Sequence, residues 1–214
     1  FRFDTDPGIT LEEDLSRRDL TINAIAKAPD GTLIDPYGGQ KDLADRQLRH
    51  VSDAFTEDPL RILRLAQFQA RLKGLGFTVD DQTTRLCREM VARGDLDTLS
   101  RERVFKELEK ALSAPHPSEF FAVLASVNAL AQMFQGVELA ETKNLDGPAT
   151  DTSPPSRFSQ LVLENPDLDL QALNKQLAIP KHWLELAGMT RTWAAAFCQV
   201  TTLRADAILE ILER

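Results

Sequence analysis

The sequence predicts a mainly α-helical fold, in which a short α/β segment of about 50 residues precedes a helical body. From Pro59 onward, apolar residues recur at helical spacing over 59–72, 81–93, 101–112 and 117–134. Strand signals are confined to Thr32-Leu33-Ile34. With 43% hydrophobic and 27% charged residues, the 214-residue chain has the composition of a folded globular protein rather than a disordered one.

The first 50 residues carry mostly turn signals. Residues 1–15 are predicted to be extended or loop-like, and residues 16–27 to form a short helix that Ser16 caps. Asp30-Gly31 is a tight-turn dipeptide before the candidate strand. Pro36 and Gly38-Gly39 then interrupt regular structure.

The later helices have clearer boundaries. Asp58 and Pro59 form a favourable helix start, with the acidic residue as cap and proline in the first turn. Ser100 is the predicted cap of the helix over 101–112. A polar loop is predicted at about 136–156, and short helices separated by prolines over 157–214.

Composition restricts the classes of function. The net charge of −8 disfavours nucleic-acid binding if only bulk charge is considered. No apolar run is long enough to span a membrane, and no signal-peptide pattern is present. The first residue is not Met, so we expect the chain to begin inside a longer protein. Cys87 and Cys198 are far apart and form no disulfide framework, which favours a reducing cytoplasm.

Paired arginines precede an acidic residue in Arg17-Arg18-Asp19. Two arginines at a predicted helix start are unfavourable, because that end of the helix dipole prefers anions. Guanidinium groups bind phosphate oxygens, and an Asp carboxylate accepts hydrogen bonds from ribose hydroxyls. The group therefore suits a nucleotide, with a surface cluster of ion pairs as the alternative.

A basic stripe follows the Asp58-Pro59 helix start. Arg61, Arg64 and Arg71 lie within about 80° of each other on the helical wheel, and Glu57 lies near the same stripe. Leucines and Phe68 supply apolar contacts on the remaining faces. The stripe could hold an anionic ligand against the core, or it could be a solvated face whose Asp is only a helix cap.

An Asp and an Arg one helical turn apart could also recognise a base. Cytosine and adenine both present an amino donor beside a ring-nitrogen acceptor, which Asp58 and Arg61 complement. Uracil and guanine reverse this pattern and would leave a buried group unpaired, at a cost of about 1–3 kcal/mol. One Asp/Arg pair could therefore accept C and A and reject U and G.

These residues resemble motifs of the class II tRNA nucleotidyltransferases, the CCA-adding enzymes, a family that includes the bacterial poly(A) polymerases. The resemblance is continuous from about Leu11 to Leu112, and its order and spacing agree over separate blocks. The segment Arg49–Phe55 is more similar to the CCA-adding branch. The matching blocks are Arg17-Arg18-Asp19-Leu-Thr-Ile-Asn-Ala, Ile34-Asp-Pro-Tyr-Gly-Gly, Leu48-Arg-His-Val, Glu57-Asp-Pro-Leu-Arg and Leu99-Ser-Arg-Glu-Arg-Val with Glu107.

The resemblance implies a role for each matching residue. Arg18 and Asp19 would contact the triphosphate and ribose, and Arg64 would help to bind the nucleotide. Asp58 and Arg61 would form the amino-acid template that reads the incoming base. The implied nucleotide-binding set is Arg17, Arg18, Asp19, Asn23, Asp58, Arg61 and Arg64, and the implied positioning set is Glu57, Arg103 and Glu107.

The resemblance also divides the chain. Residues 1–52 would be the rear part of a polymerase-β-like α+β head, and 53–112 a helical neck that carries the base template. Residues 113–214 would be a helical body that holds the tRNA. The expected activity is addition of the 3′-terminal CCA to tRNA from CTP and ATP in the cytoplasm, with no membrane partner.

Two departures from the family pattern matter. Gln67 stands where related bacterial enzymes often have another arginine, which could change nucleotide affinity. Asp4-Thr5-Asp6 matches the residue pattern of the family's metal-binding Asp-x-Asp motif. No glycine-rich turn precedes it, so we expect these residues to form a loop. The Mg²⁺-binding carboxylates would then lie upstream of Phe1. Because phosphoryl transfer needs those metals, residues 1–214 alone are expected to be inactive.

Three alternatives stay open at this point. Within the family, the protein could be a poly(A) polymerase or an enzyme that adds only CC or only A. In another class, it could be a non-catalytic helical protein that binds RNA.

Overall fold

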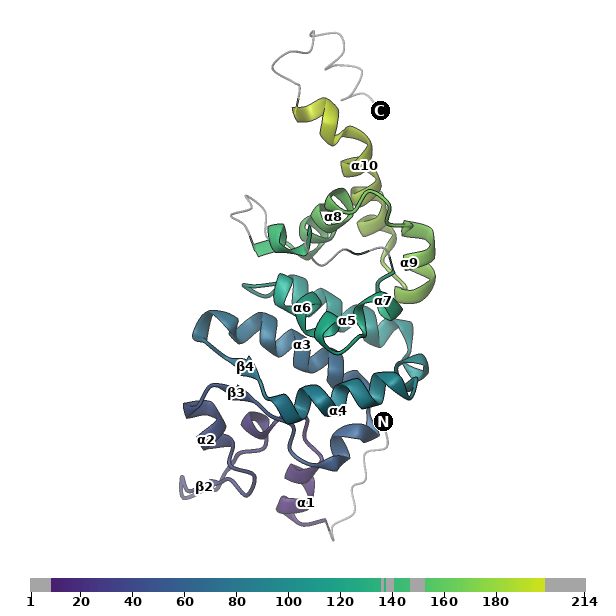
Figure 1. Cartoon of the computed structure of the whole chain (residues 1–214). Coiled ribbons are helices and arrows are strands. Elements are labelled where there is room, and N and C mark those ends of the chain that lie inside the picture. Colours follow the sequence, from purple (N-terminus) through teal and green to yellow (C-terminus); the bar gives the residue numbers. More distant parts are fainter. Residues whose placement is uncertain (1–8, 136, 138–140, 147–152, 199–214) are drawn as a thin grey trace.

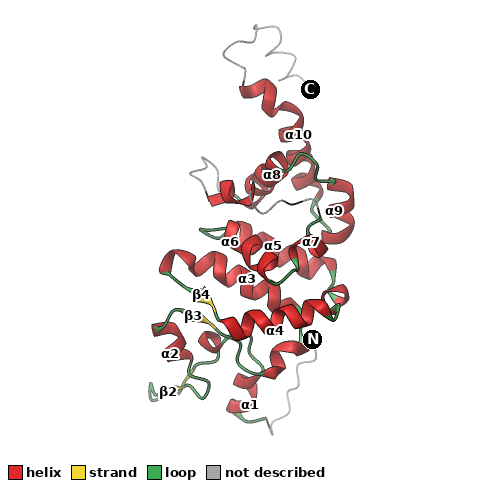
Figure 2. Cartoon of the chain, in the orientation of Figure 1, coloured by secondary structure: helices red, strands yellow, loops and turns green. Residues whose placement is uncertain are grey.

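The structure is a computed structural model that describes residues 9–135, 137, 141–146 and 153–198. The described part is mostly helical, as predicted, and its few strands are two residues long (Figure 2). The molecule is elongated, and the chain runs along it from α1 and α2 at one end to α10 at the other (Figure 1). None of the described helices is long and apolar enough to cross a membrane.

The first helix begins earlier than predicted. α1 spans Leu11–Ser16, where a loop was expected, and Ser16 ends this helix instead of capping the next one. The Thr10 side chain accepts from the Glu13 N–H while Glu13 accepts from the Thr10 N–H, a capping box that starts the helix. The predicted helix over 16–27 was wrong, because only a 3-10 turn, Thr21–Asn23, forms within it before strand β1.

Two small strand pairs complete the front part. β1 (Ala26–Lys27) pairs antiparallel with β2 (Leu33–Ile34) across the predicted Asp30-Gly31 turn. β3 (Gln47–Leu48) pairs parallel with β4 (Thr78–Val79), which ties the front part to the chain after α3.

The helix α2 (Gly39–Ala44) packs closely against the backbone at Thr21. A Cβ added at Gly39 would lie 2.2 Å from the Thr21 carbonyl oxygen, so only glycine permits this approach. The Asp42 side chain, which is buried, accepts from the Thr21 hydroxyl at 2.7 Å and pairs with Arg49. The residues after Asp19 are thus held firmly against α2.

The middle of the molecule confirms the predicted helices. They are α3 (Leu60–Leu72), α4 (Asp81–Ala92), α5 (Arg101–Leu112), α6 (Ser118–Ser126) and α7 (Leu130–Met133). α3 lies at the centre and packs against both α5 and α6. Phe120, Phe121 and Phe134 meet edge to face and are fully buried beneath them.

The last described segment contains longer helices than expected. They are α8 (Pro154–Glu164), α9 (Leu170–Leu177) and α10 (Lys181–Cys198), of which α10 has 18 residues. Residues 141–146 form a 3-10 helix and α8 starts at Pro154, so part of the predicted 136–156 loop is helical. Of these predictions, residues 136, 138–140 and 147–152 of the loop and 199–214 of the last helices lie outside the described residues.

One continuous hydrophobic core joins the front, middle and last segments. It extends from Leu20 to Ala187 in sequence. Trp183 of α10 packs against Phe105 of α5 and Phe158 of α8. Because α3 and α5 are anchored in this core, the polar side chains that they present on one side have fixed positions.

Candidate functional site

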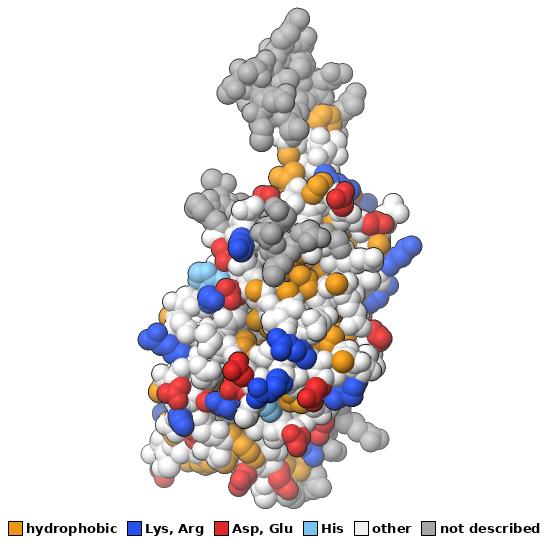
Figure 3. All heavy atoms as spheres, in the orientation of Figure 1, with side chains coloured by type: hydrophobic (Ala, Val, Ile, Leu, Met, Phe, Trp, Pro, Cys, Tyr) orange, Lys and Arg blue, Asp and Glu red, His pale blue; other side chains and the backbone are white. Residues whose placement is uncertain are grey.

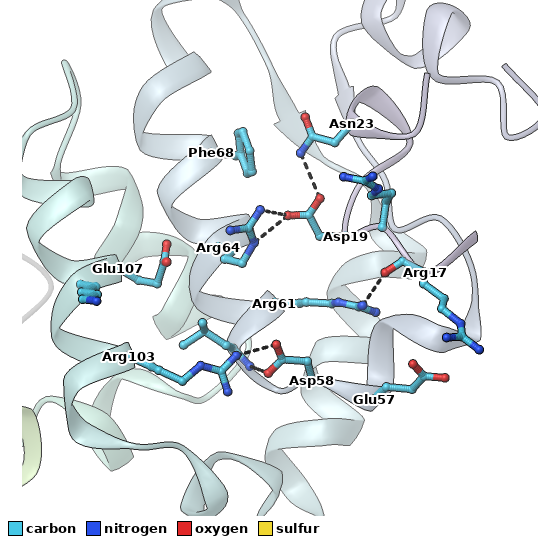
Figure 4. A pocket seen from close by; sticks show the side chains of 13 residues that line it. Arg17, Asp19, Asn23, Glu57, Asp58, Arg61, Arg64, Phe68, Arg103 and Glu107 are labelled. Atoms are coloured by element: carbon cyan, nitrogen blue, oxygen red, sulfur yellow. Dashed lines mark hydrogen bonds and ion pairs between the residues drawn. The ribbon is translucent and has the colours of Figure 1, made fainter. Parts of the chain in front are cut away.

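A pocket of about 1030 Å³ lies where the chain after α1, the start of α3 and one face of α5 converge (Figure 4). Its lining comes from residues far apart in sequence. All ten site residues predicted from the sequence line it, and three further residues join them: Leu60, Phe68 and Lys106.

Two of the three further residues follow the helical periods of the predicted ones. Phe68 lies four residues after Arg64 on α3, and Lys106 three residues after Arg103 on α5, so each shares a face with a predicted residue. Gln67, which replaces a frequent arginine of the family, is half-buried on α3 and is not among the lining residues. Arg71 is exposed and also lies outside the pocket.

Asp19 is the most fully bonded carboxylate in the pocket. It is 6% exposed. Its Oδ2 accepts from Arg64 Nε at 2.7 Å and Nη2 at 2.6 Å, and its Oδ1 from the Leu20 N–H and Asn23 Nδ2 (Figure 4). Four donors occupy the four acceptor positions of the carboxylate. Asp19 therefore holds Arg64 and Asn23 in place.

The ionisation of Asp19 follows from these contacts. Burial works to raise the pKa of this carboxyl group, but the Asn23 hydrogen bond, the Arg64 charge and hydrogen bond, and the Leu20 N–H together lower the pKa below its usual value. Asp19 is therefore a carboxylate at neutral pH.

Asp58 has acceptor capacity left. Its Oδ1 accepts from the Leu60 N–H at 3.2 Å, although Pro59, and not the predicted Asp58, is the N-cap residue of α3. Its Oδ2 accepts from Arg103 Nη2 of α5 at 2.6 Å (Figure 4). With two of about four lone-pair positions used, this carboxylate can accept further hydrogen bonds in the pocket.

Arg61 is bound to the backbone on the other side of the pocket. Its Nη1 donates to the Ala54 carbonyl and its Nη2 to the Arg17 carbonyl (Figure 4). Burial lowers the pKa of this guanidinium, while the carboxylates of Asp58, Asp19 and Glu57 oppose the shift. Arg61 thus links the chain after α1 to the 3-10 helix Asp53–Glu57 that leads into α3.

Arg17 and Arg18 lie at the C-terminal end of α1, not at a helix start. This corrects the electrostatic premise of the prediction, because cations are favourable at a helix C-terminus. Both side chains are exposed, and Arg18 pairs with Asp14 at 2.9 Å. They form a solvent-accessible cationic edge of the pocket.

Glu57 and Glu107 differ in their surroundings. Glu57 is exposed, whereas Glu107 is 3% exposed and its Oε1 accepts from Lys110 at 2.7 Å. The Glu107 Oε2 has no hydrogen-bond partner among the described residues.

The pocket is cationic although the chain is acidic. Six arginine and lysine side chains and four carboxylates line it, so its charge is positive while the whole chain carries −8. Bulk charge was therefore a poor guide to this surface. The pocket can bind an anion at its Arg17–Arg18 edge and a hydrogen-bond donor at Asp58.

The pocket carboxylates do not fit a magnesium ion. Asp19, Asp58 and Glu107 are each paired with a cation, and the described residues contain no group of three His, Cys, Asp or Glu suited to a metal. Asp4 and Asp6, for which a loop was predicted, lie outside the described residues.

Comparisons with known proteins agree with the sequence motifs. The model of the poly A polymerase head domain matches residues 3–49, and that of the probable RNA and SrmB-binding site of polymerase A matches residues 76–140. The Multifunctional CCA protein of Pseudomonas putida is 43% identical over 217 residues, which cover 100% of this chain. The CCA-adding enzyme of Coxiella burnetii is 39% identical over 99% of this chain and 57% of the relative.

A solved structure of a tRNA-processing enzyme with CTP has the same fold. It matches with a TM-score of 0.71 at 25% identity, over 91% of this chain and 58% of the other. The chain spans 59% of the length of the Pseudomonas relative.

Proposed function

This chain belongs to the class II tRNA nucleotidyltransferase and poly(A) polymerase family of bacterial type, and from this premise we propose that the protein adds the 3′-terminal CCA to tRNA. CTP and ATP would supply the nucleotides, and pyrophosphate would leave. The observation that carries the proposal is the single pocket in which all ten motif residues meet.

Arg17 and Arg18 would bind the triphosphate. They form the exposed cationic edge of the pocket, and guanidinium groups bind phosphate oxygens with two parallel hydrogen bonds. Cations there would offset the negative charge of the phosphates, which opposes attack by the 3′-hydroxyl of the RNA, the nucleophile in this reaction.

Asp58 and Arg61 would read the base. Asp58 keeps acceptor positions for the amino group of cytosine or adenine, and Arg61 keeps N–H donors for the neighbouring base acceptor. Uracil and guanine would place a carbonyl against the Asp58 carboxylate, which leaves both acceptors unpaired at a cost of about 1–3 kcal/mol. One pair of side chains then serves both substrates.

Asp19 would act on the nucleotide through its neighbours. Its acceptor positions are occupied, so the ribose contact passes to Asn23, whose amide donates to Asp19 and whose oxygen remains available to a ribose hydroxyl. Arg64, fixed by Asp19, would add a second cation beside the nucleotide.

The division into a head (1–52), a neck (53–112) and a body (113–214) remains part of the proposal. Family membership also makes Mg²⁺ the expected cofactor. Asp19, Asp58 and Glu107 are already paired with cations, so these three carboxylates do not serve as its ligands in this proposal. A cytoplasmic location is proposed as well, consistent with the buried free thiol of Cys87.

The test is nucleotide addition by the full-length protein to a tRNA transcript that lacks its 3′ CCA. With Mg²⁺, CTP and ATP, the product should lengthen by three nucleotides and then stop, and a tRNA that already ends in CCA should stay unchanged. A long adenosine tail would identify a poly(A) polymerase instead. RNA binding without any addition would contradict an enzymatic role.

A further inference from the structure

We infer that Phe68 and Lys106 form a second subsite of the pocket, which holds the 3′-terminal nucleotide of the RNA. The Phe68 ring stacks on the terminal base, and the Lys106 ammonium group binds the phosphate on the 5′ side of that nucleotide. The inference rests on the proposed function of the pocket and deepens it, because neither residue belongs to the nucleotide-binding set that the sequence motifs imply.

Phe68 presents an aromatic ring on the pocket face of α3. It lies four residues after Arg64 and seven after Arg61, so the three side chains share one face of the helix. The ring is half-buried and packs against the core while it also lines the pocket. Figure 4 shows Phe68 beyond Arg64, on the side away from Asp58. A partly exposed ring in a cationic pocket is a surface on which a base can stack.

Lys106 brings a positive charge that the described part of the chain does not pair. The side chain is exposed on α5, three residues after Arg103, and no described residue binds its ammonium group. Arg61 and Arg64 differ, since their guanidinium groups already donate to backbone carbonyls and to Asp19. The ammonium group of Lys106 is therefore free to bind an anion from outside the protein.

The subsite is separate from the one proposed for the incoming nucleotide. Phe68 lies two turns beyond Arg61, which is about 10 Å along the axis of α3. Stacked aromatic rings have centroids about 4.5–7 Å apart, so we assign a ring on Phe68 to a different base from the one that Asp58 and Arg61 read. A pocket for one small ligand has a volume of roughly 300–1000 Å³, and this one has about 1030 Å³. It has room for part of a second nucleotide.

The proposed reaction supplies that second nucleotide. The attacking 3′-hydroxyl belongs to the last nucleotide of the RNA, which must lie beside the incoming nucleotide. The last nucleotide changes during CCA addition, because each product is the next substrate. Stacking on an aromatic ring tolerates every base, whereas hydrogen bonds to base edges select among bases. Phe68 and Lys106 therefore suit the RNA end, as Asp58 and Arg61 suit the selected nucleotide.

The first test compares RNA binding with nucleotide binding in the full-length protein. Phe68→Leu keeps an apolar side chain against the core but has no aromatic face. We expect this variant to raise the KM for a tRNA transcript that lacks its 3′ CCA about tenfold, while the Kd of CTP without RNA stays unchanged. Leu72→Ala is the matched control, because Leu72 also packs from α3 against the core and lies outside the pocket. The control should change neither constant.

The second test removes the charge of Lys106 with little risk to the fold, because the side chain is exposed. Lys106→Gln should weaken RNA binding and lower the slope of log affinity against log salt concentration by about 0.7, the effect of one lost phosphate contact on a single strand. Lys41→Gln, exposed on α2 and outside the pocket, should leave this slope unchanged. An unchanged slope in Lys106→Gln would overturn the phosphate contact.

A fluorescent base at the RNA end reports stacking directly. With 2-aminopurine as the last nucleotide of the transcript, the wild type and Phe68→Tyr should quench the emission, and Phe68→Leu should quench it much less. Equal quenching by all three proteins, or a Phe68→Leu protein whose CTP affinity falls as much as its RNA affinity, would overturn the inference while the proposed function stands. A wild-type protein that adds no nucleotide would overturn both.

Discussion

The ion pair between Asp19 and Arg64 should be the polar contact in the pocket that contributes most to folding. Asp19→Ala removes a carboxylate that accepts four hydrogen bonds, two of them from Arg64. The variant leaves the Arg64 guanidinium, the Asn23 amide and the Leu20 N–H without their common acceptor. The contacts join the turn around Asp19 and the 3-10 helix Thr21–Asn23 to α3, so their loss should loosen the pocket as well as the local turn.

The size of the effect follows from burial. Breaking a fully buried pair costs about 3–5 kcal/mol. The Arg64 side chain is 38% exposed and can regain water, which reduces the cost to about 2–3 kcal/mol. Arg64→Gln should cost as much, because it leaves the 7% exposed Asp19 side chain without its charged partner. The double variant should show a coupling of about 1–2 kcal/mol.

Urea unfolding at several pH values measures these quantities. Since the folded pKa of Asp19 is lowered, the carboxylate contributes its full stabilisation above its unfolded pKa, about 3.9. That stabilisation is lost as the pH falls through the lower folded pKa. The difference in free energy of unfolding between wild type and Asp19→Ala should thus be constant from about pH 5 to 8 and shrink below about pH 4. If Asp19→Ala lowers the free energy of unfolding by less than about 0.5 kcal/mol at pH 7, or if its deficit grows in acid, the ion pair does not stabilise the fold in this way.

Three other outcomes are expected. Gly39→Ala should destabilise the fold by about 3 kcal/mol or more in urea unfolding, because the new Cβ would lie 2.2 Å from the Thr21 carbonyl oxygen. Phe120→Ala should lower the free energy of unfolding by about 3–5 kcal/mol, because it removes a fully buried ring from the core. In a Cys198→Ser background, Cys87 should resist thiol reagents until the protein unfolds, since the thiol is buried and burial raises its pKa to about 12.

Matched positions provide the controls for these outcomes. Gly188→Ala places its Cβ where nothing lies within 4 Å, within helix α10, and should not destabilise. Leu75, which is 62% exposed, should tolerate alanine with little loss. Rapid labelling of Cys87 in the native protein, or equal losses at Gly39 and Gly188, would contradict the packing described above.

The helices were predictable where the periodicity of apolar residues and the capping residues indicate the same helix. Periodicity and the Asp58-Pro59 start predicted α3, and its bounds differ from the prediction by one residue. The Asp80 side chain caps α4, which was predicted over 81–93. α1 is only six residues long and forms where a loop was predicted, because Thr10 and Glu13 make a capping box at its start. Because α1 ends at Ser16, Arg17 and Arg18 lie at a helix C-terminus and not at the helix start that was predicted.

The site was predictable as a set of residues but not as a network. Order and spacing predicted which residues line the pocket, yet Asp19–Arg64 and Asp58–Arg103 each join positions 45 apart in sequence. No local pattern encodes such a pairing, since it depends on how α3 and α5 pack. For the same reason the sequence did not reveal that Asp19 is fully occupied while Asp58 is not.

The central claim is that one carboxylate in one pocket recognises both cytosine and adenine. Equilibrium binding of CTP, ATP, UTP and GTP to the full-length protein and its Asp58→Ala variant tests it most directly. We expect the variant to lose affinity for CTP and ATP together, about tenfold or more, while its weak binding of UTP and GTP hardly changes. A variant that binds all four nucleotides as the wild type does, or that loses only one of the two substrates, would contradict the claim.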